Sequence, residues 1–199
     1  PHLCHKEGLE PAGNCRACVV EVEGERTLAA SCCRAVAPGM KVKTDSARAV
    51  TARKMVVELL MSDAGATTDA YTKQSELSGW AQKLGVSTGR LPQRDAHYAE
   101  ADLSHPAIAV NLDACIQCTR CLRACRDEQG NDVIGLAFRG GHAQITFDTG
   151  AALGESSCVA CGECVQACPT GALMPAGGGS MVKADKKVDS VCPYGGIGC

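Results

Sequence analysis

The stretch CIQCTRCLRAC at 115–125 recurs as CVACGECVQAC at 158–168. All four cysteines return at an offset of 43 residues, and repeated units of one design usually stack to share a core. Each copy has the form C-x2-C-x2-C-x3-C. Cysteines bunched at gaps of two and three residues indicate metal ligation, whereas disulfide frameworks spread their cysteines along the chain.

Three thiolates at gaps of two residues can wrap one corner of a cubic cluster. A tetrahedral zinc site usually takes two such thiolates and two more from a distant segment. In two-cluster ferredoxins the fourth cysteine of each motif ligates the other cluster. We therefore predict two [4Fe–4S] clusters, with a zinc-binding module as the alternative. One cluster takes Cys115, Cys118, Cys121 and Cys168, and the other takes Cys158, Cys161, Cys164 and Cys125.

A separate cysteine set precedes the repeat, with the form C-x10-C-x2-C-x13-C. Plant-type [2Fe–2S] proteins use C-x4-C-x2-C and a distant fourth cysteine, so the longer first gap is a departure. Cys33 competes with Cys32 as the fourth ligand. We favour Cys32, because neighbouring residues of a strand point to opposite faces and only one can reach the metal. Cys33 is then a small buried hydrophobe. The predicted [2Fe–2S] ligands are Cys4, Cys15, Cys18 and Cys32.

The composition fits a chain held together by metal. Fifteen of 199 residues are cysteine and aromatics make up only 3%, so large core side chains are scarce. The net charge of −2 comes without a basic run, which argues against a nucleic-acid partner. No apolar stretch approaches the ~20 residues that span a bilayer. Because thiolate ligands need reducing conditions, we expect the cytoplasm.

Hydrophobic periodicity predicts an α+β chain. Each helix has an apolar face for packing, and Gly85 ends the second. The expected elements are a hairpin at 19–22 and 27–30, a strand at 42–44, helices at 46–61 and about 73–84, and a second hairpin at 133–138 and 143–147.

These motifs together carry a resemblance to known proteins. The first cysteine set, a helix containing RKMVVE (53–58) and the double repeat resemble the N-terminal region of three related groups. These are the complex I large subunit, the iron hydrogenases and the catalytic subunit of NAD-dependent formate dehydrogenase. The segments VCPY (191–194) and GIGC (196–199) look like the opening of the molybdopterin oxidoreductase domain, C-P-Y-C-G-x-G-C. That ending most resembles molybdenum or tungsten formate dehydrogenase.

The resemblance implies a domain order. A partial β-grasp [2Fe–2S] ferredoxin domain would span 1–45, with its opening strands before Pro1. A helical connector would span 46–106, and a bacterial-type 2[4Fe–4S] ferredoxin domain would span 107–175. The linker and the start of a molybdopterin domain would span 176–199. Cys192 and Cys199 would then be partial ligands of a further [4Fe–4S] cluster.

The resemblance also implies a function. Formate would be oxidised at a Mo/W-bis-pterin guanine dinucleotide centre completed beyond Cys199, so no catalytic residue lies in this chain. The clusters would pass electrons toward a flavin- and NAD-binding iron–sulfur partner subunit. The alternative is the relay module of an NAD-linked hydrogenase or of a complex I large subunit.

Two departures from the family pattern stand out. The families usually carry a site of one histidine and three cysteines before the repeat, but no cysteine occurs between Cys33 and Cys115. His97 and His105 lie in that gap as lone histidines. Gly195 stands where the family has a cysteine ligand. Two interpretations of the arginines near the clusters stay open, tuning of cluster potential and solvated surface. These arginines are Arg120, Arg123, Arg126 and Arg139.

Overall fold

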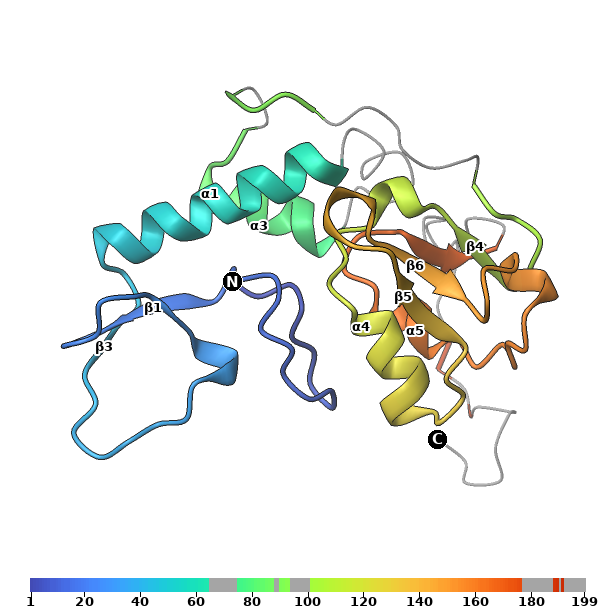
Figure 1. The fold of residues 1–199 in the computed structure, drawn as a ribbon, viewed down its shortest axis with the longest axis horizontal. Helices are drawn as coiled ribbons and strands as arrows, with labels where there is room; N and C mark the ends of the chain where they lie inside the picture. Colours follow the sequence, from blue (N-terminus) through green and yellow to red (C-terminus); the bar gives the residue numbers. More distant parts are fainter. Residues whose placement is uncertain (65–74, 88–89, 94–100, 177–187, 190, 192–199) are drawn as a thin grey trace.

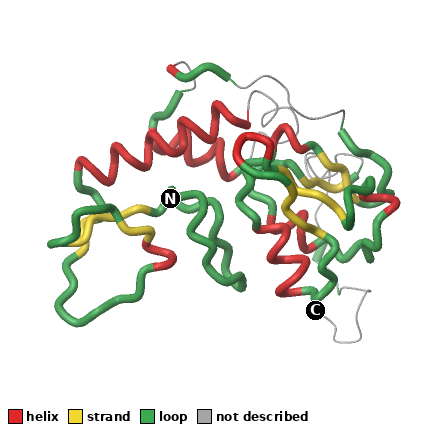
Figure 2. Tube along the Cα trace, viewed as in Figure 1, coloured by secondary structure: helices red, strands yellow, loops and turns green. Residues whose placement is uncertain are grey.

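The computed structural model describes residues 1–64, 75–87, 90–93, 101–176, 188–189 and 191. Within these ranges the chain is a mixture of short helices and strands joined by long loops (Figure 2). A small sheet and two helices lie at one end of the molecule, and a unit of short helices and paired strands lies at the other (Figure 1). The N-terminal loop lies between these two parts.

The N-terminal sheet has three antiparallel strands in the order β2-β1-β3. The central strand β1 (Val19–Val22) pairs with β2 (Ala29–Ala30) and with β3 (Val42–Lys43). Its three valines are buried, because β-branched side chains pack well on a half-covered pleated surface. The predicted hairpin and the following strand are confirmed.

Two helices connect this sheet to the rest of the chain. Helix α1 (Ala47–Ala64) packs against β1 and against α3 (Glu76–Leu84). The Ser75 side chain caps α3 by accepting the Ser78 N–H at 3.0 Å, and Gly85 ends it at φ 61°. Both predicted helices are therefore confirmed within the described ranges. None of the helices there combines the length and apolar character that crossing a membrane requires.

The C-terminal unit closes on itself. Strand β4 (Ile108–Val110) pairs antiparallel with β7 (Leu173–Pro175), so the start and the end of this unit meet. Strands β5 (Ile134–Ala137) and β6 (Gln144–Phe147) form the hairpin predicted between the two cysteine repeats. Each copy of the repeat thus lies between one strand of the closing pair and one strand of the hairpin.

The two repeats contain equivalent helices that end differently. Helix α4 (Arg120–Arg123) continues into the π-helical turn η4 (Ala124–Glu128), and it packs against α5 (Glu163–Ala167). Pro169 lacks the N–H that a further turn would need, so α5 ends at Ala167 with Cys168 as its C-cap. Arg126 occupies the equivalent position of the first copy and lets the helix continue. Short 3-10 turns complete the fold: η1 (Ser31–Cys33), η3 (Leu112–Ala114), η5 (Gly140–His142) and η6 (Leu153–Glu155).

Turn η6 packs so closely that one position has no room for a side chain. A Cβ on Gly154 would lie 2.5 Å from the backbone oxygen of Ser104. We expect Gly154→Ala to lower the free energy of unfolding by about 1–3 kcal/mol, because backbone atoms must shift to accept the methyl group. Gly141→Ala is the matched control, since a Cβ there meets nothing within 4 Å. Urea unfolding followed by circular dichroism measures both, and equal losses would contradict the packing argument.

Candidate metal centres

The first pocket of the C-terminal unit collects cysteines from both repeats. It is lined by Cys115, Cys118 and Cys121 of the first copy and by Cys168 of the second. The rest of the lining is almost wholly apolar. The pocket contains about 360 Å³ of space between atoms, part of it open to solvent. The structure therefore brings together the four residues of the first predicted set.

The second pocket shows the reciprocal exchange. Three of its cysteines, Cys158, Cys161 and Cys164, come from the second copy, and Cys125 comes from the first. Cys125 lies on η4, the π-helical turn that follows α4. Isolated π-turns within helices are frequent at functional sites. The second predicted set is also brought together.

The backbone of each repeat turns sharply around its pocket. Gln117 and Thr119 of the first copy have positive φ angles, and so do the equivalent Ala160 and Gly162. In consequence the Gln117 N–H donates to Cys115 Sγ at 3.4 Å, and the corresponding N–H and sulfur of the second copy are also 3.4 Å apart. Non-glycine residues in this conformation cost energy and persist where function requires them. The cost fits a loop shaped to surround a bound group.

The thiols in the pockets are poorly solvated. Burial raises the pKa of Cys118 to about 12, and the neighbouring Cys168 and Cys115 contribute in the same direction. Burial likewise raises the pKa of Cys164 to about 12, with contributions from Cys158, Cys161 and Cys125. Such thiols ionise readily only when a cation compensates their charge. The donor set therefore fits a positively charged iron cluster.

The N-terminal set contains two contacting pairs. Cys4 and Cys15 are adjacent, since the Cys4 N–H donates to Cys15 Sγ at 3.3 Å. The hydrogen bond between their two thiols lowers the pKa of Cys4 to about 6 and raises the pKa of Cys15. Cys18 and Cys32 form a second pair, with their sulfurs 3.4 Å apart. The set is therefore brought together as two pairs, one on the N-terminal loop and one beside the small sheet.

Our reason for preferring Cys32 over Cys33 is wrong. Both residues lie on the 3-10 turn η1 and not on a strand, so their side chains do not point to opposite faces. Their sulfurs are 3.6 Å apart. Cys33 is exposed, and the predicted burial of its side chain is therefore also wrong. What favours Cys32 is its 3.4 Å contact with Cys18.

A zinc site is the alternative to an iron cluster in each cysteine-lined pocket. Among the described residues, no three His, Cys, Asp or Glu side chains converge closely enough to hold a single metal ion. A tetrahedral zinc site needs its ligands within about 2.0–2.3 Å of one point. Each set of four cysteines lines a single pocket, and metal analysis of the protein distinguishes the two alternatives.

The remaining candidate ligands are accounted for separately. His105 is buried, and its Nδ1 accepts the N–H groups of Ala107 at 3.1 Å and Ile108 at 3.2 Å. The Nδ1 atom is therefore occupied by backbone hydrogen bonds. His97, Cys192, Gly195 and Cys199 lie outside the described residues, so their predicted roles are not addressed by the structure.

The four arginines divide into two pairs. Arg126 and Arg139 are exposed, and Arg126 pairs with Asp127 at 2.7 Å. Arg120 and Arg123 are only 2% and 6% exposed, so solvated surface is the wrong interpretation for them. The sequence already distinguishes the two buried arginines, because the second repeat has no arginine at the equivalent positions. At the equivalent positions the second repeat has Glu163 and Gln166, although the surrounding cysteines repeat without change.

Comparison with protein families agrees with this geometry. Residues 1–47 match a 2Fe-2S iron-sulfur cluster binding domain. Residues 105–174 match the ferredoxin-like domain of NADH-quinone oxidoreductase subunit 3. The chain carries the two-part iron–sulfur module typical of subunits of NADH-quinone oxidoreductases and NAD-reducing hydrogenases.

Individual relatives match over most or all of the chain. An NADH-quinone oxidoreductase subunit of Rhizobium meliloti is 32% identical over the whole chain, which covers 24% of that relative. The NADP-reducing hydrogenase subunit HndD of Solidesulfovibrio fructosivorans is 37% identical over 87% of the chain, which covers 31% of it. The chain thus spans about a quarter to a third of the length of these two relatives.

A solved structure shows the same fold for most of the module. A chain in the crystal structure of an NAD+-reducing [NiFe]-hydrogenase in the H2-reduced state matches with a TM-score of 0.81 and 26% identity. The match covers 89% of this chain and 75% of that one. These relatives are oxidoreductase subunits by name, and none of the three is named as a formate dehydrogenase.

Proposed function

We propose that this chain is an electron relay that holds one [2Fe–2S] and two [4Fe–4S] clusters. The observation that carries the proposal is the exchange of cysteines between the pockets. Each pocket combines three cysteines of one repeat with the last cysteine of the other. Two-cluster ferredoxins use the same exchange.

The pockets and the N-terminal pairs support the following ligand sets. Cys115, Cys118, Cys121 and Cys168 hold one [4Fe–4S] cluster. Cys125, Cys158, Cys161 and Cys164 hold the other. Cys4, Cys15, Cys18 and Cys32 hold the [2Fe–2S] cluster.

The residues around each cluster determine how it is held, how far water reaches it and at what potential it is reduced. When bound, the clusters supply one-electron transfer. The thiolates fix each cluster, and apolar neighbours such as Ile116 and Leu173 limit the access of water to the first pocket. Burial and nearby charge set the reduction potential of an iron–sulfur centre. Both pockets are lined mainly by cysteines and apolar side chains, with Thr119 and Thr170 in the first and Asn131 in the second, which suits conduction of electrons between other sites.

The partner follows from the names of the relatives. They are called NADH-quinone, NADP-reducing and NAD+-reducing enzymes, so each is linked to a nicotinamide cofactor. Nicotinamides exchange two electrons at once, whereas clusters carry one. A flavin on a partner subunit would divide the pair, and we propose that this chain exchanges electrons with such a subunit.

The relay is tested by its metal content. We expect the chain, prepared without oxygen, to contain about ten irons and as many sulfides, because two, four and four irons fill the three sets. Iron, sulfide and zinc analysis measures this, together with paramagnetic resonance after reduction. A colourless protein with zinc in place of iron would overturn the proposal. Clearly more than ten irons would reveal a further site, for example one that uses His97.

Formate dehydrogenase is the more specific candidate for the parent enzyme. The sequence at 191–199 favours it, because VCPY and GIGC resemble the opening of a molybdopterin domain. Cys192 and Cys199 would then contribute to a fourth cluster beside a Mo/W-bis-pterin guanine dinucleotide. An NAD-linked hydrogenase or a complex I subunit is the alternative that the relatives favour.

Substrate-dependent reduction separates these parents. We expect formate to reduce the clusters of the full-length enzyme, and molybdenum or tungsten to be present. Reduction by hydrogen without either metal would identify a hydrogenase instead. In the same enzyme Gly195→Cys should strengthen the signal of the fourth cluster, since it supplies the ligand that the family pattern contains.

A further inference from the structure

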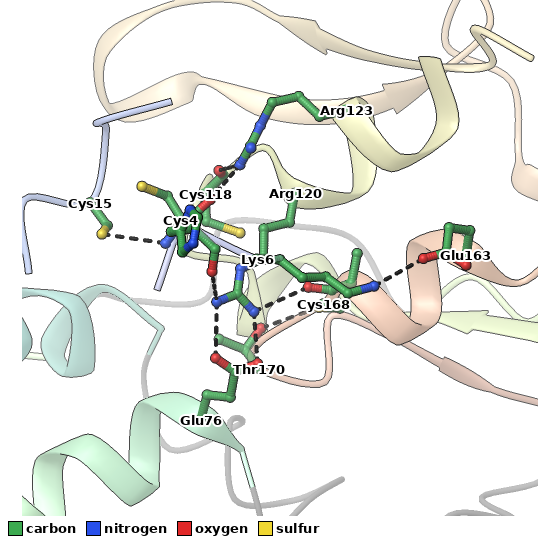
Figure 3. Close-up of polar contacts among 12 residues, drawn as sticks. Cys4, Lys6, Cys15, Glu76, Cys118, Arg120, Arg123, Glu163, Cys168 and Thr170 are labelled. Atoms are coloured by element: carbon green, nitrogen blue, oxygen red, sulfur yellow. Dashed lines mark hydrogen bonds and ion pairs between the residues drawn. The ribbon is translucent and has the colours of Figure 1, made fainter. Parts of the chain in front are cut away.

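The loop that carries the first [2Fe–2S] ligand lies directly against the first cysteine repeat. Arg123 of α4 makes this contact (Figure 3). Its Nη1 donates to the backbone oxygen of Glu10 at 2.5 Å. Its Nη2 donates to the backbone oxygen of Cys4 and also lies 3.4 Å from that of Cys118. One guanidinium nitrogen therefore contacts a proposed ligand residue of the [2Fe–2S] cluster and one of the first [4Fe–4S] cluster.

Arg120 holds the same loop one helical turn earlier. It donates to the backbone oxygen of His5 and to both carboxylate oxygens of Glu76, at 2.7 and 3.0 Å. It also lies 3.4 Å from the oxygen of Ala167. Arg120 thus joins the N-terminal loop, the connector helix α3 and the second repeat. A buried cation with so many acceptors is geometrically fixed.

Two further contacts surround the arginines. Asn14 Nδ2 donates to Thr119 Oγ1 at 3.0 Å and lies 3.4 Å from the oxygen of Cys118. Lys6 pairs with Glu163 at 2.9 Å. The side chains of Leu3 and Cys4 join Ile116 and Cys118 in one buried apolar cluster.

The two repeats differ in charge at the positions that contact the N-terminal loop. The first copy has arginines at 120 and 123, where their guanidinium groups meet carbonyl oxygens of the loop. The second copy has Glu163 at the position of Arg120, and Glu163 meets the cation Lys6 of the same loop. The two copies therefore present opposite charges to one segment, each matched to what it contacts.

We propose that Arg123 is the positioning residue for electron transfer between the [2Fe–2S] cluster and the cluster held by Cys115, Cys118, Cys121 and Cys168. The inference rests on the proposed relay function. Arg123 fixes the distance and path between the two centres by holding the backbones of Cys4 and Cys118 on one nitrogen. Arg120 supports it by holding the loop.

Electron transfer between the two clusters involves a single electron. With both clusters bound, one electron would leave one cluster, which would be oxidised, and enter the other, which would be reduced. No covalent bond forms or breaks, and Arg123 stays protonated because guanidinium does not lose its proton in proteins. The residue therefore contributes geometry and not chemistry.

The conservative variant Arg123→Lys tests this role in the complete holoprotein. Lysine keeps the charge but lacks the planar fork that reaches two carbonyl groups at once. We expect opening of the loop at residues 4–10 to become about ten- to a hundredfold more frequent, as loss of a charged hydrogen bond predicts. Hydrogen exchange of its amides measures the opening. Freeze-quench paramagnetic resonance should show slower electron exchange between the two clusters, with unchanged iron content and midpoint potentials.

Two other variants keep the test decisive. Arg126→Lys is the matched control, because Arg126 follows on the same helical segment but is exposed and pairs locally with Asp127. It should change neither measurement. Asn14→Ala removes contacts from the loop side and should increase loop opening about two- to tenfold, so it replaces Arg123→Lys if that variant fails to assemble.

The outcomes separate the two proposals. If Arg123→Lys, or Asn14→Ala in its place, exchanges electrons at the wild-type rate with intact clusters, the positioning role is wrong and the relay stands. A slower rate explained wholly by shifted midpoint potentials would also overturn it, since Arg123 would then act by charge. If the wild-type holoprotein holds three clusters that exchange no electrons, the relay proposal itself fails.

Discussion

Cys125→Ser should destroy the [4Fe–4S] cluster whose other three ligands lie more than thirty residues further along the chain. The reason is that Cys125 lines the pocket of Cys158, Cys161 and Cys164 and not the pocket of its own repeat. We expect a loss of about four irons of ten, because a serine oxygen replaces one thiolate of one cluster. Iron analysis and paramagnetic resonance of the reduced protein measure the loss.

Double variants show which cluster was lost. If Cys125 and Cys161 share a cluster, combining Cys125→Ser with Cys161→Ser should remove no more iron than either change alone. Combining Cys125→Ser with Cys118→Ser should remove about eight irons, since two clusters are then affected. The reverse pattern would show that Cys125 ligates the cluster of its own repeat, and the proposed exchange would be wrong. Cys33→Ser controls for loss of a thiol as such.

Loss of either cluster should also weaken the fold. Cys121, Cys125 and Cys164 belong to the same buried cluster as Ile108, Val110 and the other aliphatic side chains of the unit. The metal sites and the hydrophobic core therefore occupy the same space. In domains with few large side chains, bound metal supplies part of the folding free energy. Cys125→Ser should accordingly lower the unfolding temperature as well as the iron content.

Much of the C-terminal unit could be predicted because its information is local and repeated. The constant offset of 43 residues paired each cysteine with its counterpart, and the turn-forming segment 139–142 between the runs 133–138 and 143–147 marked the hairpin. The positive φ angles at Gln117 and Ala160 were not predicted. Neither residue is a glycine, and a single sequence does not show which ordinary residues adopt that conformation.

The docking of the N-terminal loop could not be predicted in the same way. Arg123 and Cys4 are 119 residues apart, and no local pattern connects them. An arginine among cysteines has the same sequence signature whether it faces water or a carbonyl oxygen. Only the contrast with Gln166 in the second repeat pointed to a specific role.

Cys32→Ser should remove the [2Fe–2S] cluster, whereas Cys33→Ser should leave it in place. Of these two cysteines, Cys32 is the one that contacts another member of the predicted set, through the 3.4 Å approach of its sulfur to that of Cys18. Cys33 turns instead toward Gly13, where a Cβ would lie 2.8 Å from its sulfur.

The expected loss in Cys32→Ser is about two irons, together with the resonance signal of the reduced [2Fe–2S] centre. The 3-10 turn places the two sulfurs only 3.6 Å apart, so the double variant Cys32→Ser/Cys33→Ser is the necessary reference. Signal that survives in Cys32→Ser and disappears in the double variant would show that Cys33 replaces its neighbour. Loss of the cluster in Cys33→Ser alone would contradict the assignment, because the ligand would then be the thiol that packs on Gly13 and not the one beside Cys18.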